Sequence, residues 1–314
     1  MTYAKHARLA ALGILGLALA TPGDTRRQPP AADGSKVLIR LVLDTNFGDA
    51  LARQYERVMP NVRVELIHVV GSVATVAAIQ RGDADMGFVY ADVAYFGYLQ
   101  LAQQRAHAEN QVCGIAALEI VPLHLLARAG LHVKTVSDLA GYRVGIGTAL
   151  SGQSLLASLM FHGYGLDPPI VQADRREDLL AGVDATFASS YYPGPTVTNA
   201  MNHGAQLIPI DGPSAAQLER EYPFVRSVTI PAGTYPGQVR DVATIGVDRL
   251  LIGSSSLDEA LAHDLTRAFI DTLPVMSSSL HTSIRLTNLD QASATPIPLH
   301  MGAARYYRER ELMR

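Results

Sequence analysis

The stretch "VRVELIHVVGSVATVAAIQRGDADMGFVYADV", residues 62–93, decides the fold. Its first nine residues alternate between apolar and polar side chains, as a half-buried β-strand does. Gly71-Ser72 then opens a helical run that Gly82 closes, and a second apolar strand follows, ending from Tyr90 to Asp92. A strand, a helix and a strand in direct succession predict a parallel β-α-β unit, from which doubly wound α/β folds are built.

The same pattern extends in both directions. Before it, "KVLIRLVL" from Lys36 reads as a strand, and "DALARQYERVM", residues 49–59, has the apolar spacing of an amphipathic helix. After residue 113 the pattern starts again, with strands and helices expected in residues 114–130, 135–147, 151–165 and 181–189.

The C-terminal part predicts one more extended segment and two helices. "DVATIGVDRLLIG", residues 241–253, reads as extended. Ser256 and Glu259 have the spacing of a capping box, which predicts the start of a strong helix. Residues 299–314 predict a final helix. One apolar face of the strong helix is formed by Leu261, Leu265, Ala268, Phe269 and Leu273.

Together these elements predict an α/β protein with the two-lobed, type II-like fold of periplasmic binding proteins. We expect each lobe to be a doubly wound sheet with helices, with a hinge between the lobes. Residues 36–122 together with 244–314 would form lobe I, and residues 123–243 lobe II. Ligands of such sheets bind at the carboxyl ends of the strands.

The first residues predict export. Lys5, His6 and Arg8 precede an apolar run that ends in Ala18-Leu19-Ala20, the build of a secretory signal peptide with its cleavage site. The run has about 12 residues, and a membrane span needs roughly 20. We therefore expect a signal peptide in residues 1–20, a flexible linker in residues 21–35, and a periplasmic or other extracytoplasmic protein.

Composition argues against a nucleic-acid partner. The net charge is −3, charged residues make up 18% of the chain, and tryptophan is absent. Nucleic-acid binding calls for a clustered basic surface or aromatic stacking platforms. Cys113 is the single cysteine, so it can form no intrachain disulfide, and we expect it to pack as a small hydrophobic residue.

A glycine-rich loop, "RVGIGTALSGQS" at residues 143–154, resembles two nucleotide motifs and lacks a required residue of each. Leu150 stands where a dinucleotide fingerprint needs its third glycine, and no lysine follows Gly152 as in a P-loop. A helix N-terminus remains, which suits a carboxylate, at Ser151, Gly152, Gln153 and Ser154. Ordinary capping by Ser151 or Ser154 is the alternative, and both interpretations stay open.

No catalytic set is visible. The chain has no G-x-S-x-G elbow, its histidines show no H-E-x-x-H spacing, and Asp83 and Asp85 fit turn chemistry. We therefore expect no enzyme activity, no metal site and no cofactor. Uncharged polar and aromatic groups that can hydrogen-bond a ligand recur at strand–helix junctions: Ser72, Tyr90, Tyr191 and Tyr192.

Several segments resemble the TAXI family, the solute receptors of TRAP transporters. These are residues 69–94, "TVSDLAGYRVGIGTALSGQS", "AGVDATFASSYYPGP", "YPFVRSVTIPAGTYPGQVRDVATIGV" and the ending "PIPLHMGAARYYRER". The resemblance runs from about Val37 to Arg310 in the same order, and "AGTYPGQ" and the ending are its most specific parts.

The resemblance implies a periplasmic receptor that captures a small carboxylated solute, an organic acid or an amino acid such as glutamate or 2-oxoglutarate. The receptor would close its lobes on the solute and deliver it to the membrane permease subunits of a TRAP transporter. The family motifs fall on Gly71-Ser72, on Tyr90 to Asp92, on Ser151-Gly152-Gln153 and on Tyr191 and Tyr192. These motifs add Asp92 to the expected ligand-binding residues.

Four positions depart from the family pattern. The Gly-rich first loop is "DTNFGDA" here, from Asp44 to Ala50, and the tail motif HPGA carries Met301. Thr75 replaces an asparagine and Gln153 a threonine, so we expect a change of solute to show first at Gln153. The altered first loop also motivates an alternative, an exported two-lobed sensor or scaffold domain that takes no part in transport.

Overall fold

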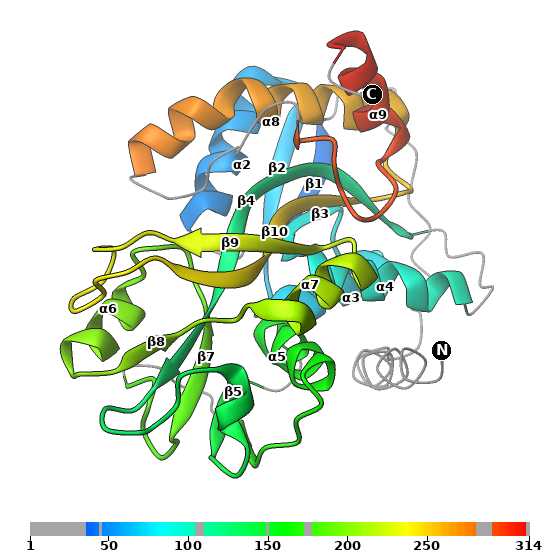
Figure 1. Cartoon of the computed structure of the whole chain (residues 1–314). Coiled ribbons are helices and arrows are strands. Elements are labelled where there is room, and N and C mark those ends of the chain that lie inside the picture. Colours follow the sequence, from blue (N-terminus) through cyan, green and yellow to red (C-terminus); the bar gives the residue numbers. More distant parts are fainter. Residues whose placement is uncertain are drawn as a thin grey trace. The chain divides into compact units, whose positions relative to one another are not determined.

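The computed structural model describes residues 36–43, 46–103, 110–148, 151–172, 178–280 and 291–311 of the chain, and the expected signal peptide and linker lie outside them. The fold is mixed α/β, as predicted (Figure 1). The described residues divide into two compact units. We call residues 36–119 with 249–311 the terminal unit, and residues 120–248 the central unit.

The terminal unit is built on the predicted β-α-β arrangement. Three parallel strands lie in the order β2, β1, β3, and β10 pairs with β3 in antiparallel fashion. The opening stretch is therefore confirmed as a strand, a helix and a strand. The elements are β1 (Val37–Leu43), β2 (Val62–His68), α3 (Ser72–Gln80), β3 (Met86–Tyr90) and β10 (Val242–Ser254).

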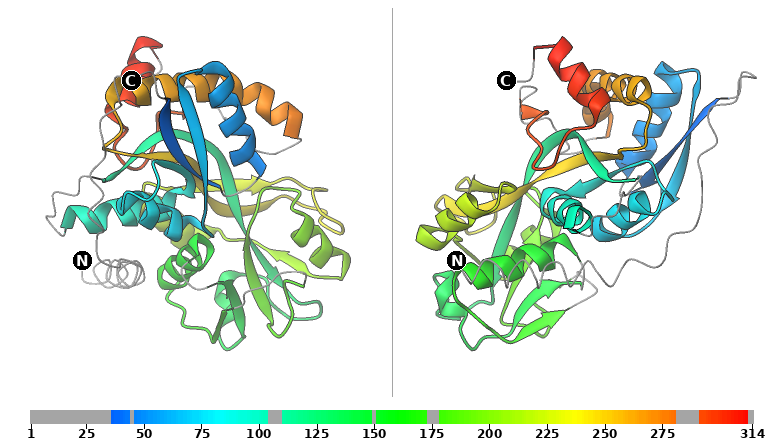
Figure 2. Two further views of the ribbon diagram at one scale, coloured as in Figure 1. Left: turned by 180° about the vertical axis from the view of Figure 1, so that it is seen from behind. Right: turned by 90° about the vertical axis from the view of Figure 1, so that its right-hand side faces the viewer.

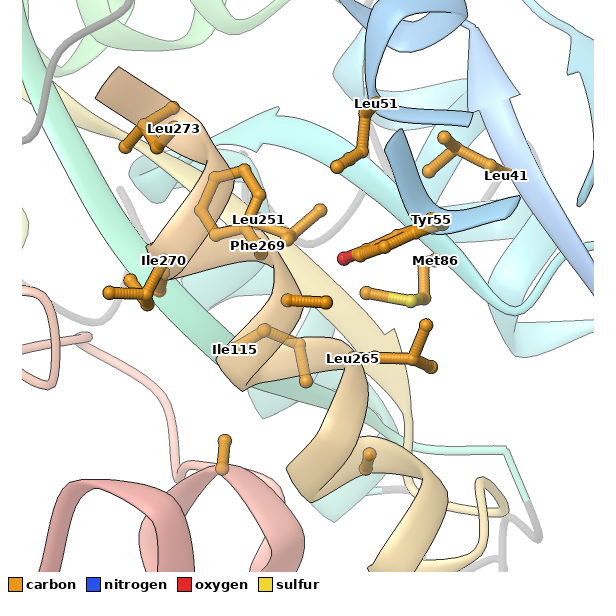
Figure 3. Close-up of a cluster of buried hydrophobic side chains, with 14 of the residues drawn as sticks. Leu41, Leu51, Tyr55, Met86, Ile115, Leu251, Leu265, Phe269, Ile270 and Leu273 are labelled. Atoms are coloured by element: carbon orange, nitrogen blue, oxygen red, sulfur yellow. The ribbon is translucent and has the colours of Figure 1, made fainter. Parts of the chain in front are cut away.

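Helices cover both faces of this sheet (Figure 2). One face carries α2 (Asn46–Val58), α8 (Glu259–Leu280) and α9 (Met301–Glu309), and the other carries α3 and α4 (Ala91–Gln103). The first face holds the main hydrophobic core, where Phe269 of α8 and Tyr55 of α2 meet Met86 of β3 (Figure 3). The predicted apolar face of α8 is confirmed, since Leu265, Ala268, Phe269 and Leu273 are buried and Leu261 packs against them.

One predicted boundary is wrong. Helix α2 already begins at Asn46, within the segment expected to be a loop, while Asp44 and Thr45 lie outside the described residues. Strand β3 ends at Tyr90, within the range from Tyr90 to Asp92 that the sequence predicted, and the unpredicted helix α4 begins directly after it at Ala91. A continuous run of buried apolar residues does not show where a strand becomes a helix.

The predicted capping box of α8 is also wrong. The helix begins at Glu259, and the Asp258 carboxylate accepts the Leu261 N–H at 3.0 Å. Ser256 instead bonds Ser254, through its N–H at 3.2 Å and its hydroxyl at 2.8 Å. An aspartate directly before the helix is an equally good cap, and here it takes the role.

The central unit repeats the α/β pattern. Strands β7 and β8 pair with β4 in antiparallel fashion, β5 pairs in parallel with β6 and β7, and β9 pairs with β10. Its elements are β4 (Val112–Ala127), η1 (Val136–Leu139), β5 (Val144–Gly147), α5 (Gly152–Gly163), β6 (Ile170–Gln172), β7 (Ala185–Ser189), α6 (Pro195–Asn202), β8 (Gln206–Ile208), α7 (Gly212–Glu221) and β9 (Val225–Ile230).

The chain passes between the units inside two long strands. The first passage lies in β4 after Glu119, and the second lies in β10 after Asp248. The two strands run so close that a Cβ atom added at Gly246 would lie 2.7 Å from the Val121 carbonyl oxygen. Only glycine fits there without a backbone shift.

A nearly buried ion pair ties β1 to the turn before β3. The Asp85 carboxylate accepts the Arg40 backbone N–H at 2.8 Å and the Arg40 guanidinium at 2.8 Å, while the guanidinium also donates to the Gly82 carbonyl. The Asp85 side chain is 2% exposed. Its neighbour Asp83, 54% exposed, pairs with Arg81 at the surface.

These two aspartates provide a matched test. Asp85→Asn leaves the Arg40 guanidinium without its counter-charge, so the free energy of unfolding should fall by about 3 kcal/mol. Asp83→Asn breaks an exposed pair and should cost about 0.5 kcal/mol or less. Urea unfolding followed by circular dichroism measures both, and equal effects would contradict the structural role of Asp85.

Candidate functional site

In the central unit, the N-terminus of α5 has the cap that the sequence suggested. Ser151 has extended backbone angles, and its Oγ accepts the Ser154 N–H at 3.1 Å while donating to the Thr148 carbonyl at 2.8 Å. The Ser154 hydroxyl donates to the Ser151 carbonyl at 2.8 Å. Capping by Ser151 is thus confirmed, and both serine side chains are committed to the loop itself.

The cap leaves two backbone donors at the positive end of the helix. Among the residues that the structure describes, none accepts the N–H of Gly152 or of Gln153. Gly152 is buried, and Gln153 is 8% exposed. Two adjacent N–H groups at a helix N-terminus can hold the two oxygens of one carboxylate.

The Gln153 side chain braces this helix end. Its Nε2 donates to the Phe187 carbonyl at 2.8 Å, and its Oε1 accepts the Ser189 N–H at 3.2 Å. Both ends of the amide are therefore used to join the first turn of α5 to the carboxyl end of β7. What Gln153 offers a ligand is its backbone N–H, and its side chain holds that donor in place.

The segment after β7 carries Tyr191 and Tyr192, which are 44% and 38% exposed. It runs directly on from Ser189, the residue that Gln153 contacts, and leads into α6 at Gly194. The structure therefore places the tyrosine segment and the start of α5 at the same strand end.

A buried chain of hydrogen bonds, which sequence reasoning missed, anchors this segment. The Gly194 N–H donates to the Tyr235 Oη at 3.1 Å, and the Tyr235 Oη lies 2.8 Å from His124 Nε2. His124 Nδ1 lies 3.3 Å from the Ala188 carbonyl. Since a carbonyl only accepts, Nδ1 carries the proton and Nε2 accepts the tyrosine O–H. Burial lowers the pKa of His124 to about 4, in keeping with a neutral ring.

These hydrogen bonds give a structural role to two residues of the "AGTYPGQ" segment, residues 232–238. Its tyrosine is Tyr235, and its glutamine, Gln238, accepts the Tyr235 N–H and donates to three surrounding carbonyls. Tyr235 and His124 are 111 residues apart, so no local pattern could have paired them.

Removing the Tyr235 hydroxyl tests how much these buried hydrogen bonds contribute to the free energy of unfolding. Tyr235→Phe leaves His124 Nε2 and the Gly194 N–H buried without partners, which should lower the free energy of unfolding by about 1–3 kcal/mol. Tyr191→Phe changes an exposed hydroxyl and should cost no more than about 0.5 kcal/mol. Urea unfolding compares them, and a neutral Tyr235→Phe would show that the chain adds no stability.

In the terminal unit, the predicted residues Ser72 and Tyr90 meet. Ser72 is the first residue of α3, and its Oγ accepts the Tyr90 N–H at 3.1 Å. Gly71 precedes it with a φ of 86°, a conformation that favours glycine. The start of α3 is thus held against the carboxyl end of β3.

Asp92 lies two residues further on, in the first turn of α4. It is completely buried, and its Oδ1 accepts the Val93 N–H at 2.9 Å. Its Oδ2 accepts no hydrogen bond from any described residue. Burial raises the pKa of this carboxyl to about 7, against the opposing effect of backbone N–H groups.

Of the two remaining departures from the family pattern, Thr75 has a structural role. Thr75 is buried in α3, where its Oγ1 donates to the Gly71 carbonyl at 3.1 Å. Met301 is 68% exposed. His300, before it, caps α9 by accepting the Gly302 N–H at 3.1 Å.

Within the described residues, no group of three or more metal-binding side chains occurs, and no helix is both long and apolar enough to span a membrane.

The Asp92 carboxyl should give stability a distinctive pH dependence. Its folded-state pKa of about 7 lies above the value of 3.8 in the unfolded chain, so its stabilising effect is complete below pH 3.8 and is lost as the pH rises through 7. Asp92→Asn removes the ionisable group, so the variant does not lose this stability as the pH rises. The stability of the variant relative to the wild type should rise by about 2 kcal/mol between pH 5 and pH 8 in urea unfolding. A constant difference would contradict the shifted pKa.

One family model matches this chain, and several solved structures share its fold. The model of the NMT1-like family matches residues 46–310. PhnD1 from Prochlorococcus marinus, solved with methylphosphonate, is similar with a TM-score of 0.53 and 11% identity over 90% of this chain and 100% of PhnD1. XAC2383 from Xanthomonas citri, bound to ATP, gives a TM-score of 0.52 and 11% identity over 89% and 100%.

The periplasmic aliphatic sulphonate binding protein SsuA from Escherichia coli shares 14% identity over 89% of this chain and 95% of SsuA, with a TM-score of 0.47. At these low sequence identities the solved structures support a conclusion about the fold only. They confirm the predicted fold of two-lobed periplasmic binding proteins. The TAXI subtype is a finer expectation. The match to residues 46–310 spans most of the chain, and the chain therefore belongs to the NMT1-like family.

Proposed function

We propose that this protein is an extracytoplasmic receptor that binds a small carboxylated solute, an organic acid or an amino acid, and delivers it to a TRAP-type transporter. The observation that carries the proposal is the N-terminus of α5. Its cap is complete, yet the N–H groups of Gly152 and Gln153 donate to no described residue. Two aligned donors at a positive helix end are a site for an anion.

The charge of this helix end favours a carboxylate. Residues 144–163 contain no lysine and no arginine, so the loop and helix supply partial charges only. A carboxylate brings one negative charge and two acceptor oxygens, which match two N–H groups. A phosphate dianion normally recruits a lysine or arginine as well.

The fold supports binding of a small anion. PhnD1, which shares it, was solved with methylphosphonate, and XAC2383 was solved with a chloride ion. In both cases the bound species carries negative charge.

Delivery to a TRAP transporter and the absence of enzyme activity rest on the resemblance to the TAXI receptors. The segments that carry the resemblance include "AGTYPGQ", whose Tyr235 anchors the segment after β7 at Gly194. Residues 1–20, with the pattern of a signal peptide, support export. A chain that binds a solute without supporting its uptake would instead be the sensor or scaffold considered above.

Gly152→Pro tests the anion site with little disturbance of the fold. Proline suits the first position of a helix, and Ser151 before it already has the extended backbone that a following proline requires. The substitution removes one N–H donor. Because a hydrogen bond to a charged group contributes about 1.5–3 kcal/mol, affinity should fall at least tenfold. Calorimetry with L-glutamate, 2-oxoglutarate, succinate and methylphosphonate measures it.

Gly152→Ala is the matched control, since it adds a side chain and keeps the N–H. It should bind more tightly than Gly152→Pro, and both variants should unfold at the wild-type temperature. Unchanged affinity in a folded Gly152→Pro protein would refute the assignment of the anion to α5.

A further inference from the structure

Strand β2 forms one edge of the sheet in the terminal unit, since it pairs only with β1 among the described strands. Backbone groups along a strand point alternately to its two sides. The Val64 N–H donates to the Glu56 side chain at 2.9 Å, so it points away from β1. The Val62 N–H also lies outside the ladder and donates to the Met59 carbonyl. Val62, Val64 and Leu66 therefore present their backbone groups to the open edge.

Most of these edge groups have no hydrogen-bond partner. The carbonyls of Val62 and Val64 and both backbone groups of Leu66 bond no residue that the structure describes. An exposed row of this kind is a template for pairing with another strand, and proteins commonly cover or charge it. Here the Glu56 carboxylate covers the Val64 N–H and leaves the other groups open.

The charges of β2 are complementary to a second copy of the same strand. Arg63 and Glu65 lie on either side of Val64, both are exposed, and neither makes an ion pair with a described residue. If two copies ran antiparallel about a two-fold axis at Val64, Arg63 of each would lie opposite Glu65 of the other. An axis at Arg63 or at Glu65 would instead place like charges opposite each other. The charges therefore favour the register centred on Val64.

The same register suits the backbone and the apolar side chains. It pairs Val64 with Val64 of the second copy and Val62 with Leu66, and these are the residues whose backbone groups point outward. Val64 and Leu66 are half-buried and pack against the hydrophobic core of the terminal unit, on the face of β2 opposite the two charges. A second copy would cover the exposed part of both side chains.

We propose that two copies of this chain associate through β2, antiparallel about Val64, into one continuous sheet. Such an interface is isologous, as two-fold symmetry requires. The Val64 N–H exchanges the Glu56 carboxylate for a backbone carbonyl of the second copy, so Glu56 acts against association. The inference goes beyond the proposed function, because the edge of β2 contains none of the residues assigned to the solute.

Charge reversals test the interface by analytical ultracentrifugation of the full chain. The wild type should pass from monomer to dimer as the protein concentration rises. Arg63→Glu and Glu65→Arg each place like charges opposite each other twice, so each should raise the dissociation constant at least tenfold. An equimolar mixture of these two variants should dimerise again, because every charge then lies opposite its counter-charge.

Two further variants complete the comparison. Glu56→Ala uncovers the Val64 N–H and should lower the dissociation constant. Arg220→Glu is the matched control, since it makes the same charge change at an exposed position of α7 in the central unit and should leave the dissociation constant unchanged. Thermal unfolding verifies that each variant is folded.

Disulfide trapping tests the register. In a Cys113→Ser background, Val64→Cys should link two chains on oxidation, because the two positions lie opposite each other across the axis. Ile67→Cys should not, because in this register Ile67 lies opposite Asn61 and the two copies of position 67 are far apart.

The inference is overturned if the wild type stays monomeric at every concentration, if either charge variant dimerises as tightly as the wild type, or if their mixture stays monomeric. Calorimetry with the acids used for Gly152→Pro should give the same affinity for Arg63→Glu as for the wild type. The proposed function therefore stands or falls separately from this interface.

Discussion

Parallel strands impose one constraint on which both candidate sites depend. Two such strands can be joined only by a crossover, so the helix that follows each strand starts at its carboxyl end. In the terminal unit this places the starts of α3 and α4 beside each other, with Ser72 against Tyr90. In the central unit it places the start of α5 against the end of β7, with Gln153 against Ser189. Donors for anions therefore gather at strand ends without any charged side chain.

The polar side chains around these strand ends differ in whether their hydrogen bonds are made within the protein. Gln153, His124 and Tyr235 use their hydrogen-bonding capacity within the protein and hold the surrounding loops. Asp85 is likewise satisfied, by Arg40. Asp92, seven residues further along the chain, is just as buried, but one of its oxygens has no hydrogen-bond partner among the residues that the structure describes. Two aspartates on either side of one strand thus differ in how the surrounding residues satisfy their carboxylates.

Sequence reasoning succeeded where the physical signal is local. The alternation of β2, the glycines at the two ends of α3, the spacing of α8, and the cap at Ser151 all depend on residues a few positions apart. It failed where several short-range solutions compete, as at Ser256, which has the right spacing for a cap but loses the role to Asp258. It also could not find the bond between His124 and Tyr235, which only the paired strands bring together. The ligand contacts at Ser72, Tyr90, Asp92, Tyr191 and Tyr192 stay predictions.

The passage of the chain through β4 and β10 has a consequence for the order in which the protein can assemble. The central unit is one uninterrupted segment, so all its strand partners are present once residue 248 has been made. The terminal unit must wait, because β3 pairs with β10 across a separation of about 160 residues and its core includes α8 and α9. Contacts between such distant residues form slowly, since a long loop must close first. Strand β3 and the core face of the terminal unit therefore gain their last partners only after the C-terminal residues have been made.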